Sequence, residues 1–281
     1  MKSFPGLLNR FFVWLQRSDI KGKYSFYKKT KDFFSDKLII HDSAAGKFAV
    51  PYDQWCFWQT RGPANYYLEE LAPFCSAIND YLGEFDFIDL GADVGVVSHL
   101  VANNCCKNQV IYAFEPNPIS FKILEKNSQS SLNRFLAINK AISSFNGVAK
   151  FIFDDSVKSD HEGHLEINRT GSTAVSTLDN ALQKITLNSD LAIKIDVEGQ
   201  EAEIFKGAQS TLKKCEKAVI LLEIHPDTLE RDGLTPEDLF AAVESIRKCR
   251  WYVPLLDKTF DRSVPFFEQF PIQQYDLIGY I

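Results

Sequence analysis

The chain has 281 residues, of which 45% are hydrophobic and 24% charged, a composition that is typical of a globular protein and excludes wholesale disorder. It contains no run of about 18 apolar residues, and its start lacks a small-residue cleavage pattern, so neither a transmembrane helix nor a signal peptide is predicted. The net charge of -6 is uneven, because residues 1–37 carry nine Lys or Arg against three Asp or Glu, which leaves -12 for the remainder. This acidic remainder argues against nucleic acid as the main partner.

The six cysteines form no C-x-x-C pair and are scattered through predicted helices and core segments. Buried free thiols are typical of a reducing compartment, so we expect a cytoplasmic protein. His161 and His164 resemble a metal-binding pair, but Gly163 lies between them in a polar stretch, which favours a solvated loop. We therefore predict no metal site there and interpret residues 154–171 as a loop near the substrate.

The N-terminal segment combines aromatic and basic residues. Apolar residues recur there at helical spacing, with Lys2, Arg10 and Arg17 elsewhere around the helix. Such a helix packs on its own domain or on a partner chain, including a second copy, or lies on a membrane surface. We expect residues 1–84 to form a helical and irregular extension, with short strands over 38–60 and a helix over 65–78 that is interrupted near Pro73. The apolar positions are Phe4, Leu7, Leu8, Phe11, Trp14 and Leu15.

From about Asp86 onward, strand and helix patterns alternate along the chain. This alternation predicts parallel strands joined by right-handed crossovers, in an α/β domain that spans residues 85–281. The expected strands are Phe85–Leu90, Val110–Glu115, Arg134–Asn139, Ala149–Phe153, Leu191–Asp196, Ala218–Ile224, Trp251–Leu255 and Tyr275–Ile281. The expected helices are Gly95–Asn104, Pro118–Ser130, Glu201–Cys215 and Pro236–Lys248.

The first two of these strands end in residues suited to a nucleoside. The first runs into Asp89–Gly95, where glycines let the backbone approach a ligand closely. The second ends at Glu115, whose carboxylate can accept two hydrogen bonds from a ribose diol. A tight turn without a ligand, or a capping role for Glu115, would explain either feature alone. Together, at a separation of about twenty residues, they predict a nucleoside-cofactor pocket.

Two cofactors compete for such a pocket. A dinucleotide site requires glycine at the second position of G-x-G-x-x-G, so that a pyrophosphate can approach the helix N-terminus. Here Asp93 occupies that position, and its carboxylate would repel a pyrophosphate. S-adenosylmethionine (SAM) has no phosphate but carries a sulfonium and an ammonium group, which Asp89 and Asp93 can attract. The charges therefore favour SAM over NAD.

Six motifs follow one another in the next part of the chain. They are Asp89–Gly95 with Ser98, Ala113–Pro118 with Leu124 and Asn127, Ala141–Ser143 with Gly147, Ser176–Asp179, Lys194–Gly199 with Gly207 and Ala208, and Leu222–Pro226. Across residues 85–226 the chain thereby resembles the FkbM family of SAM-dependent methyltransferases. The family usually carries Asn where this chain has Asp93.

The resemblance implies a Rossmann-like class I methyltransferase fold. Its sheet would have seven mostly parallel strands, the last one antiparallel, with helices on both faces. It also implies transfer to oxygen, commonly a sugar or polyketide hydroxyl. By position in this fold, the methionine part of SAM would be bordered by Asp89, Gly91, Ala92, Asp93 and Gly95. Glu115 would bind the ribose hydroxyls, Pro116 would shape the adenine pocket, and Asn139 and Ala141 would flank the base. Asp196 would lie where cofactor and acceptor meet.

A hydroxyl acceptor must lose its proton, which requires a base near the ends of the strands. Asp196 and Glu198 straddle one strand end, while Glu223 and His225 alternate on one face of the next strand. Imidazole titrates nearest neutral pH, so His225 is our first choice for the base, although it could instead orient the loop that follows. Lys194 shares a face with Asp196 and could form an ion pair with it.

The leading hypothesis is a SAM-dependent O-methyltransferase that acts on a hydroxyl of a carbohydrate or another small metabolite. One alternative is an NAD-linked Rossmann oxidoreductase, which Asp93 opposes, and another is a non-catalytic binding module. A divalent cation held by Asp196, Glu198 and Glu223 is a rival explanation for these acids, but no further ligand is evident. Two aromatic groups have two alternative roles, stacking on sugar rings or packing in the core. They are Trp55, Phe57 and Trp58, and an aromatic loop over residues 257–274.

Overall fold

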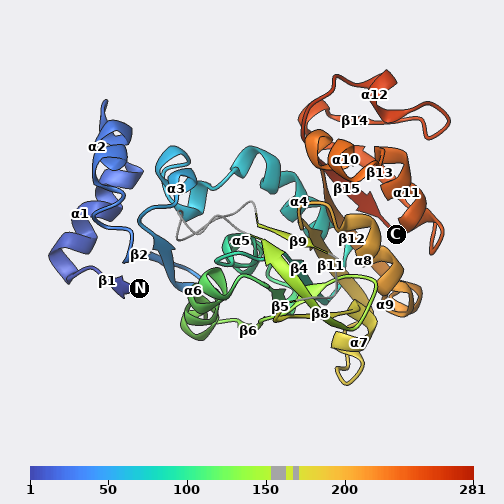
Figure 1. Cartoon of the computed structure of the whole chain (residues 1–281), viewed down its shortest axis with the longest axis horizontal. Helices are drawn as coiled ribbons and strands as arrows, with labels where there is room; N and C mark the ends of the chain where they lie inside the picture. The colour runs from blue at the N-terminus through green and yellow to red at the C-terminus, as the bar shows by residue number, and fades with distance from the viewer. Residues whose placement is uncertain (153–162, 167–170) are drawn as a thin grey trace.

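A computed structural model of the protein describes residues 1–152, 163–166 and 171–281 (Figure 1). The loop expected at residues 154–171 therefore lies largely outside the described residues, as does His161. In the described part of the chain, no helix combines the length and the apolar character needed to cross a bilayer.

The central sheet contains eight strands in the described residues, whereas the family resemblance implied seven. The additional strand is the two-residue edge strand β14. The five strands from β12 to β6 are parallel, whereas β15 is antiparallel to both of its neighbours, β12 and β13. In sheet order the strands are β14 (Lys258–Thr259), β13 (Arg250–Val253), β15 (Tyr275–Tyr280), β12 (Lys217–Ile224), β11 (Asp190–Ile195), β4 (Phe85–Leu90), β5 (Asn108–Phe114) and β6 (Arg134–Ile138).

The strand expected at residues 149–153 does not belong to this sheet. It forms β8, which pairs with its neighbours in a four-stranded sheet of β7, β10, β8 and β9. The reason is connection length, because only residues 139–146 separate β8 from β6, the preceding strand of the central sheet, whereas a parallel crossover needs about a dozen residues. The bounds are β7 (Ala141–Ile142), β8 (Gly147–Ile152), β9 (His164–Glu166) and β10 (Thr173–Ser176).

Helices cover both faces of the central sheet, and each face has its own hydrophobic core. Alternate strand residues face opposite sides, so Phe87 packs on one face and Ile88 on the other. The first face is covered by α4 (Leu68–Tyr81), α5 (Val96–Asn104) and α6 (Pro118–Ser130). The second is covered by α7 (Leu178–Leu182), α8 (Glu201–Gly207), α9 (Gln209–Lys214), α10 (Pro226–Asp232), α11 (Pro236–Glu244) and α12 (Phe266–Gln269).

Two helices differ from the sequence-based expectation. The helix predicted over 201–215 is divided into α8 and α9 at Ala208. The break follows a close approach of chains, because a Cβ on Gly207 would lie 2.3 Å from the carbonyl oxygen of Ser143. Conversely, α4 continues through Pro73 without interruption.

The N-terminal extension contains a three-stranded sheet as well as helices. Its elements are β1 (Lys2–Ser3), α1 (Gly6–Arg17), α2 (Lys23–Thr30), β2 (Lys37–Ser43), β3 (Gly46–Pro51), α3 (Trp55–Gln59) and η1 (Pro63–Asn65). The side chain of Asn127 in α6 bonds to both Ala49 N and Ala49 O, at 2.7 and 2.9 Å, and to Val94 O at 2.8 Å. The extension is thereby attached to the turn that follows β4. The division at residue 84 stays a prediction.

Candidate active site

A cleft of about 840 Å³ lies at the carboxyl edge of the central sheet. The ends of β4, β5, β11 and β12 contribute to it, together with the start of β15 and six residues of the extension between Trp55 and Leu71. The carboxyl edge is where an open α/β sheet places its ligands. The cleft therefore coincides with the region in which the sequence placed the candidate residues.

The glycine turn after β4 forms one wall of the cleft through Gly91, Ala92 and Asp93. Gly91 has φ +75°, and a Cβ there would lie 1.8 Å from the carbonyl oxygen of Asp196, so only glycine fits. Asp93 has φ +47°, a left-handed conformation that Asn and Asp tolerate best among non-glycine residues. This explains why Asp can replace Asn at the position. Gly95 does not line the cleft but packs against Leu124 and Phe135.

Asp89 lies beneath the cleft and does not line it. It is completely buried, and its Oδ2 accepts a hydrogen bond from Ser98 Oγ at 2.6 Å. Its Oδ1 lies 3.9 Å from Lys194 Nζ. Burial raises the pKa of Asp89, although Lys194 and Ser98 oppose the shift. The position of Asp89 therefore does not support direct contact with a ligand. The nearby charge that its carboxylate interacts with is that of Lys194.

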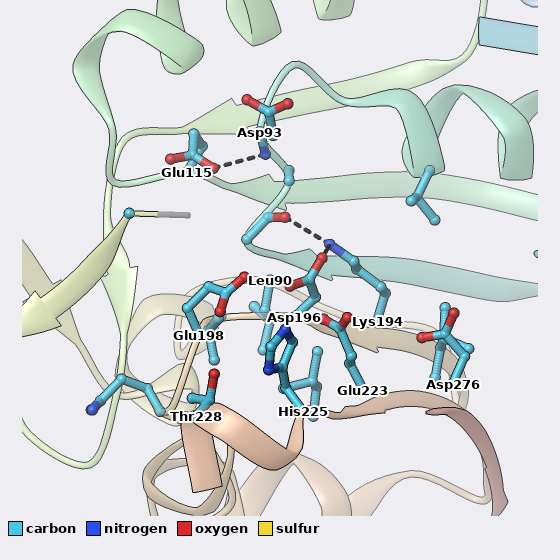
Figure 2. A pocket seen from close by; sticks show the side chains of 18 of the residues that line it. Leu90, Asp93, Glu115, Lys194, Asp196, Glu198, Glu223, His225, Thr228 and Asp276 are labelled. Carbon is cyan, nitrogen blue, oxygen red and sulfur yellow. Dashed lines mark hydrogen bonds and ion pairs between the residues drawn. The ribbon is translucent and has the colours of Figure 1, made fainter. Parts of the chain in front are cut away.

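Glu115 is 5% exposed and faces the cleft directly after β5 (Figure 2). Its Oε2 accepts a hydrogen bond from Asp93 N at 2.7 Å, and its Oε1 accepts one from Asn117 N at 2.6 Å. Burial, reinforced by the carboxylate of Asp93, raises the pKa of Glu115 to about 8. Each oxygen retains one further acceptor site for a ligand hydroxyl.

The remaining candidates for cofactor contact divide into two groups. Pro116 and Ala141 line the cleft. Asn139 does not, and its side-chain amide instead donates to the carbonyl oxygens of Glu115, at 2.7 Å, and Pro116, at 3.3 Å. Asn139 therefore holds the loop that carries Glu115 in place.

The candidate catalytic acids gather on the other side of the cleft, where Figure 2 shows Asp196, Glu198 and Glu223 beside His225. Lys194 Nζ lies 2.8 Å from Asp196 Oδ2 and donates to Gly91 O at 2.7 Å. Burial disfavours the charged amine, but the carboxylates of Asp196 and Asp89 outweigh burial and raise the pKa of Lys194. The lysine thus remains a cation that joins β11 to the glycine turn.

Glu223 lies next to Asp196, and this neighbour affects the pKa of Glu223. Burial and the neighbouring carboxylate of Asp196 raise the pKa of Glu223 well above its usual value. The two carboxyl groups share a hydrogen bond, and Gln274 Nε2 donates to Glu223 Oε1. Since two adjacent carboxylates repel each other, the pair retains a proton, which Glu223 holds.

His225 follows β12 and lines the same cleft. Its Nδ1 is buried and has no hydrogen-bond partner among the described residues. Glu198 also lines the cleft and has φ +51°, an unusual backbone conformation for a glutamate. Its carbonyl oxygen accepts a hydrogen bond from Arg231 Nη2 at 2.8 Å, which fixes this turn.

The sequence reasoning missed two contributions to the cleft. Asp276 pairs in register with Glu223, because the antiparallel β15 brings its first residues to the carboxyl edge. The position of Asp276 near the start of the last strand was the available signal. Tyr67 of the extension also lines the cleft and is 37% exposed, beside Trp55, which is 43% exposed. Phe57 and Trp58, by contrast, are fully buried in the core.

In the residues that the structure describes, no group of three or more His, Cys, Asp or Glu has an arrangement suited to a metal ion.

Comparisons with known proteins agree with this arrangement. A family model described as the methyltransferase FkbM domain matches residues 89–250. The hexuronic acid methyltransferase AglP of Haloferax volcanii is 26% identical over 153 residues, which cover 54% of this chain and 58% of that protein. The chain thus spans a little over half the length of this relative.

Two solved structures are also similar. Methyltransferase FkbM from Methylobacillus flagellatus is 17% identical, with a TM-score of 0.42, over 80% of this chain and 53% of that chain. The tRNA m1G37 methyltransferase of M. jannaschii is 14% identical, with a TM-score of 0.39, over 86% of this chain and 56% of that chain.

The mixed sheet, with the antiparallel strand β15 beside five parallel strands, and the cleft at its carboxyl edge define an α/β protein of the class I methyltransferase type. The family model covers more than half of the chain, and the chain belongs to the FkbM methyltransferase family.

Proposed function

We propose that this protein is a SAM-dependent methyltransferase that acts on a hydroxyl group of a carbohydrate. Family membership and the sugar named for the curated relative support the proposal. The observation that carries it is the combination within one cleft of a ribose-type carboxylate, Glu115, and a histidine with a neighbouring carboxyl pair, His225 with Asp196 and Glu223. These groups come from strands on either side of β4, because Glu115 follows β5 whereas the others belong to β11 and β12 or follow them directly.

The residues present fit SAM. Gly91 lines the cleft at the turn where the chain also packs on the backbone of Asp196, and the two remaining acceptor sites of Glu115 match a ribose diol. Asp93, Asp196 and the ionised form of Glu115 make this part of the cleft negative, which suits a cationic ligand. The same charges would repel the pyrophosphate of NAD, so an oxidoreductase is disfavoured.

On the acceptor side, the protein must hold a hydroxyl group and receive its proton. SAM supplies a methyl carbon that is already activated by a positively charged sulfur. Glu223 retains its own proton, and Asp196 is engaged by Lys194, so neither is the better base. His225 has a ring nitrogen that no described residue bonds, and it is the residue that accepts the proton. Asp196 and Glu223 then hold the acceptor by hydrogen bonds.

A carbohydrate suits the walls of the acceptor side. Trp55 and Tyr67 expose part of their rings at the cleft, and aromatic rings pack well on the apolar faces of sugars. Glu198, Asp227 and Asp276 line the cleft and can accept hydrogen bonds from sugar hydroxyls. The many carboxylates oppose a polyanionic acceptor such as a nucleic acid.

Calorimetry on the full chain tests the cofactor, with SAM and NADH as the two titrants. We expect SAM alone to bind, and Glu115→Gln to weaken binding at least about tenfold, since hydrogen bonds to a charged group are lost. Glu125→Gln, an exposed glutamate of α6, is the matched control. Methyl transfer is then followed by release of S-adenosylhomocysteine with a panel of neutral and acidic sugars. Binding of NADH in place of SAM would refute the proposal.

A further inference from the structure

Exposed hydrophobic side chains are concentrated at the N-terminus. Among the described residues, sixteen large hydrophobic side chains are strongly exposed, and eight of them belong to the first 33 residues. Single exposed residues need no explanation, but such a concentration marks an interaction surface. The eight are Met1, Leu7, Leu8, Phe11, Trp14, Ile20, Phe26 and Phe33.

The helix α1 presents apolar residues on two faces. One face packs into the core through Phe12 and Leu15. A neighbouring face, which points away from the core, carries Leu7, Phe11 and Trp14, which are 84%, 43% and 55% exposed. Their spacing of four and three residues places them in one stripe along the helix. The core does not bury these three side chains, so core packing does not explain why they are apolar.

This outer face is held rigidly. Asn9 Nδ2 donates to Ile40 O, and Ile40 N donates to Asn9 Oδ1, each at 2.8 Å, so α1 is attached to β2. In the described part of the chain, no residue before Trp55 lines the cleft. Figure 1 shows α1 and α2 at one end of the molecule, with α10–α12 at the other. A partner on the outer face of α1 would leave the cleft accessible.

The charges identify the partner. Arg10 and Arg17 are exposed and lie along one side of the stripe, at helical positions next to Trp14. The first 37 residues carry +6, whereas the remainder of the chain carries -12. Two copies that met through these segments would repel each other, whereas an anionic lipid surface would attract the segment and orient it.

We propose that α1 docks this protein on the surface of an anionic lipid bilayer. Leu7, Phe11 and Trp14 enter the boundary between headgroups and acyl chains, and Arg10 and Arg17 pair with lipid phosphates. The helix lies in the plane of the surface, because its other face belongs to the protein core. This docking is independent of methyl transfer and requires neither SAM nor an acceptor.

Co-sedimentation of the full chain with vesicles tests the proposal. The probes are vesicles of pure phosphatidylcholine and vesicles in which about a third of the lipid is phosphatidylglycerol. We expect binding to the anionic vesicles that weakens as NaCl is raised. The double variant Phe11→Glu, Trp14→Glu should bind at least about tenfold more weakly, and so should Arg10→Glu, Arg17→Glu. Leu132→Glu, at an 80% exposed site in the body, is the matched control and should bind normally.

Folding of each variant is checked by thermal denaturation and by its unchanged affinity for SAM, because none of the substituted residues lines the cleft. Equal vesicle binding by the Phe11, Trp14 variant and the native chain would overturn the proposal. So would absence of binding to anionic vesicles by the native chain. If sedimentation equilibrium shows a dimer that this variant dissociates, and vesicles do not bind, the surface joins two copies instead.

Discussion

The affinity for SAM should increase with pH because of Glu115. Burial and the nearby Asp93 carboxylate raise the pKa of Glu115 to about 8, so the carboxyl group of the free protein is mostly protonated at neutral pH. A carboxylate that keeps its bonds to Asp93 N and Asn117 N and also accepts two ribose hydroxyls must be ionised. Binding therefore releases a proton, and a higher pH favours it.

The magnitude follows from the ionised fraction. With a pKa of about 8, roughly 3% of Glu115 is ionised at pH 6.5 and about three quarters at pH 8.5. The apparent dissociation constant varies inversely with the competent fraction, so it should fall by about 25-fold over this range.

Calorimetry at several pH values, in buffers of different ionisation enthalpy, measures both the affinity and the proton released. The amino group of SAM titrates in the same range, so the slope in Glu115→Gln serves as the baseline. Glu125→Gln should retain the full slope of the native chain. A dissociation constant that is independent of pH, or an identical slope in Glu115→Gln, would refute the reasoning.

Four further predictions concern the rest of the cleft. His225→Ala should lower turnover by about 10²–10⁴-fold while the SAM dissociation constant stays unchanged, and equal initial rates would remove His225 as the base. Gly91→Ala should destabilise the protein by more than about 3 kcal/mol in urea denaturation, since its Cβ would lie 1.8 Å from Asp196 O; an unchanged midpoint would contradict this. Lys194→Met should cost about 3–5 kcal/mol in the same assay, because two acids lose their buried cation, and a stable variant would show that they are neutral. Trp55→Ala should raise KM for the sugar several-fold, about 1 kcal/mol of lost packing, without changing SAM affinity; an unaltered KM would place the sugar elsewhere.

The local elements were predictable because their signals are local. The strand at Phe85–Leu90 and the helix at Pro118–Ser130 have the expected bounds. In the second case Asn117 caps the helix by accepting a hydrogen bond from Ile119 N at 2.9 Å, directly before the proline. By contrast, the strand near Ala149 has an ordinary strand pattern, and nothing in that pattern shows which sheet it joins.

The residues of the candidate site also include some that the sequence could place and some that it could not. Spacing on two neighbouring strands was enough to bring Asp196, Glu223 and His225 to one edge, because parallel strands end together. Spacing could not separate Asp89 from Glu115, since both are acids near strand ends. In the structure only Glu115 faces the cleft, while Asp89 is enclosed by Ser98 and Lys194.

The sequence alone determined the bounds of elements such as the strand at Phe85–Leu90 and the helix at Pro118–Ser130, the glycine turn at Gly91 and the acids near the strand ends. These features depend on periodicity and backbone conformation, which a few neighbouring residues specify. The tertiary structure alone decided the contribution of Trp55 and Tyr67, the raised pKa of Glu223 beside Asp196, and the exposure of the outer face of α1. Those properties depend on contacts between residues that are distant in the chain, and on which surfaces remain in water after the core has formed.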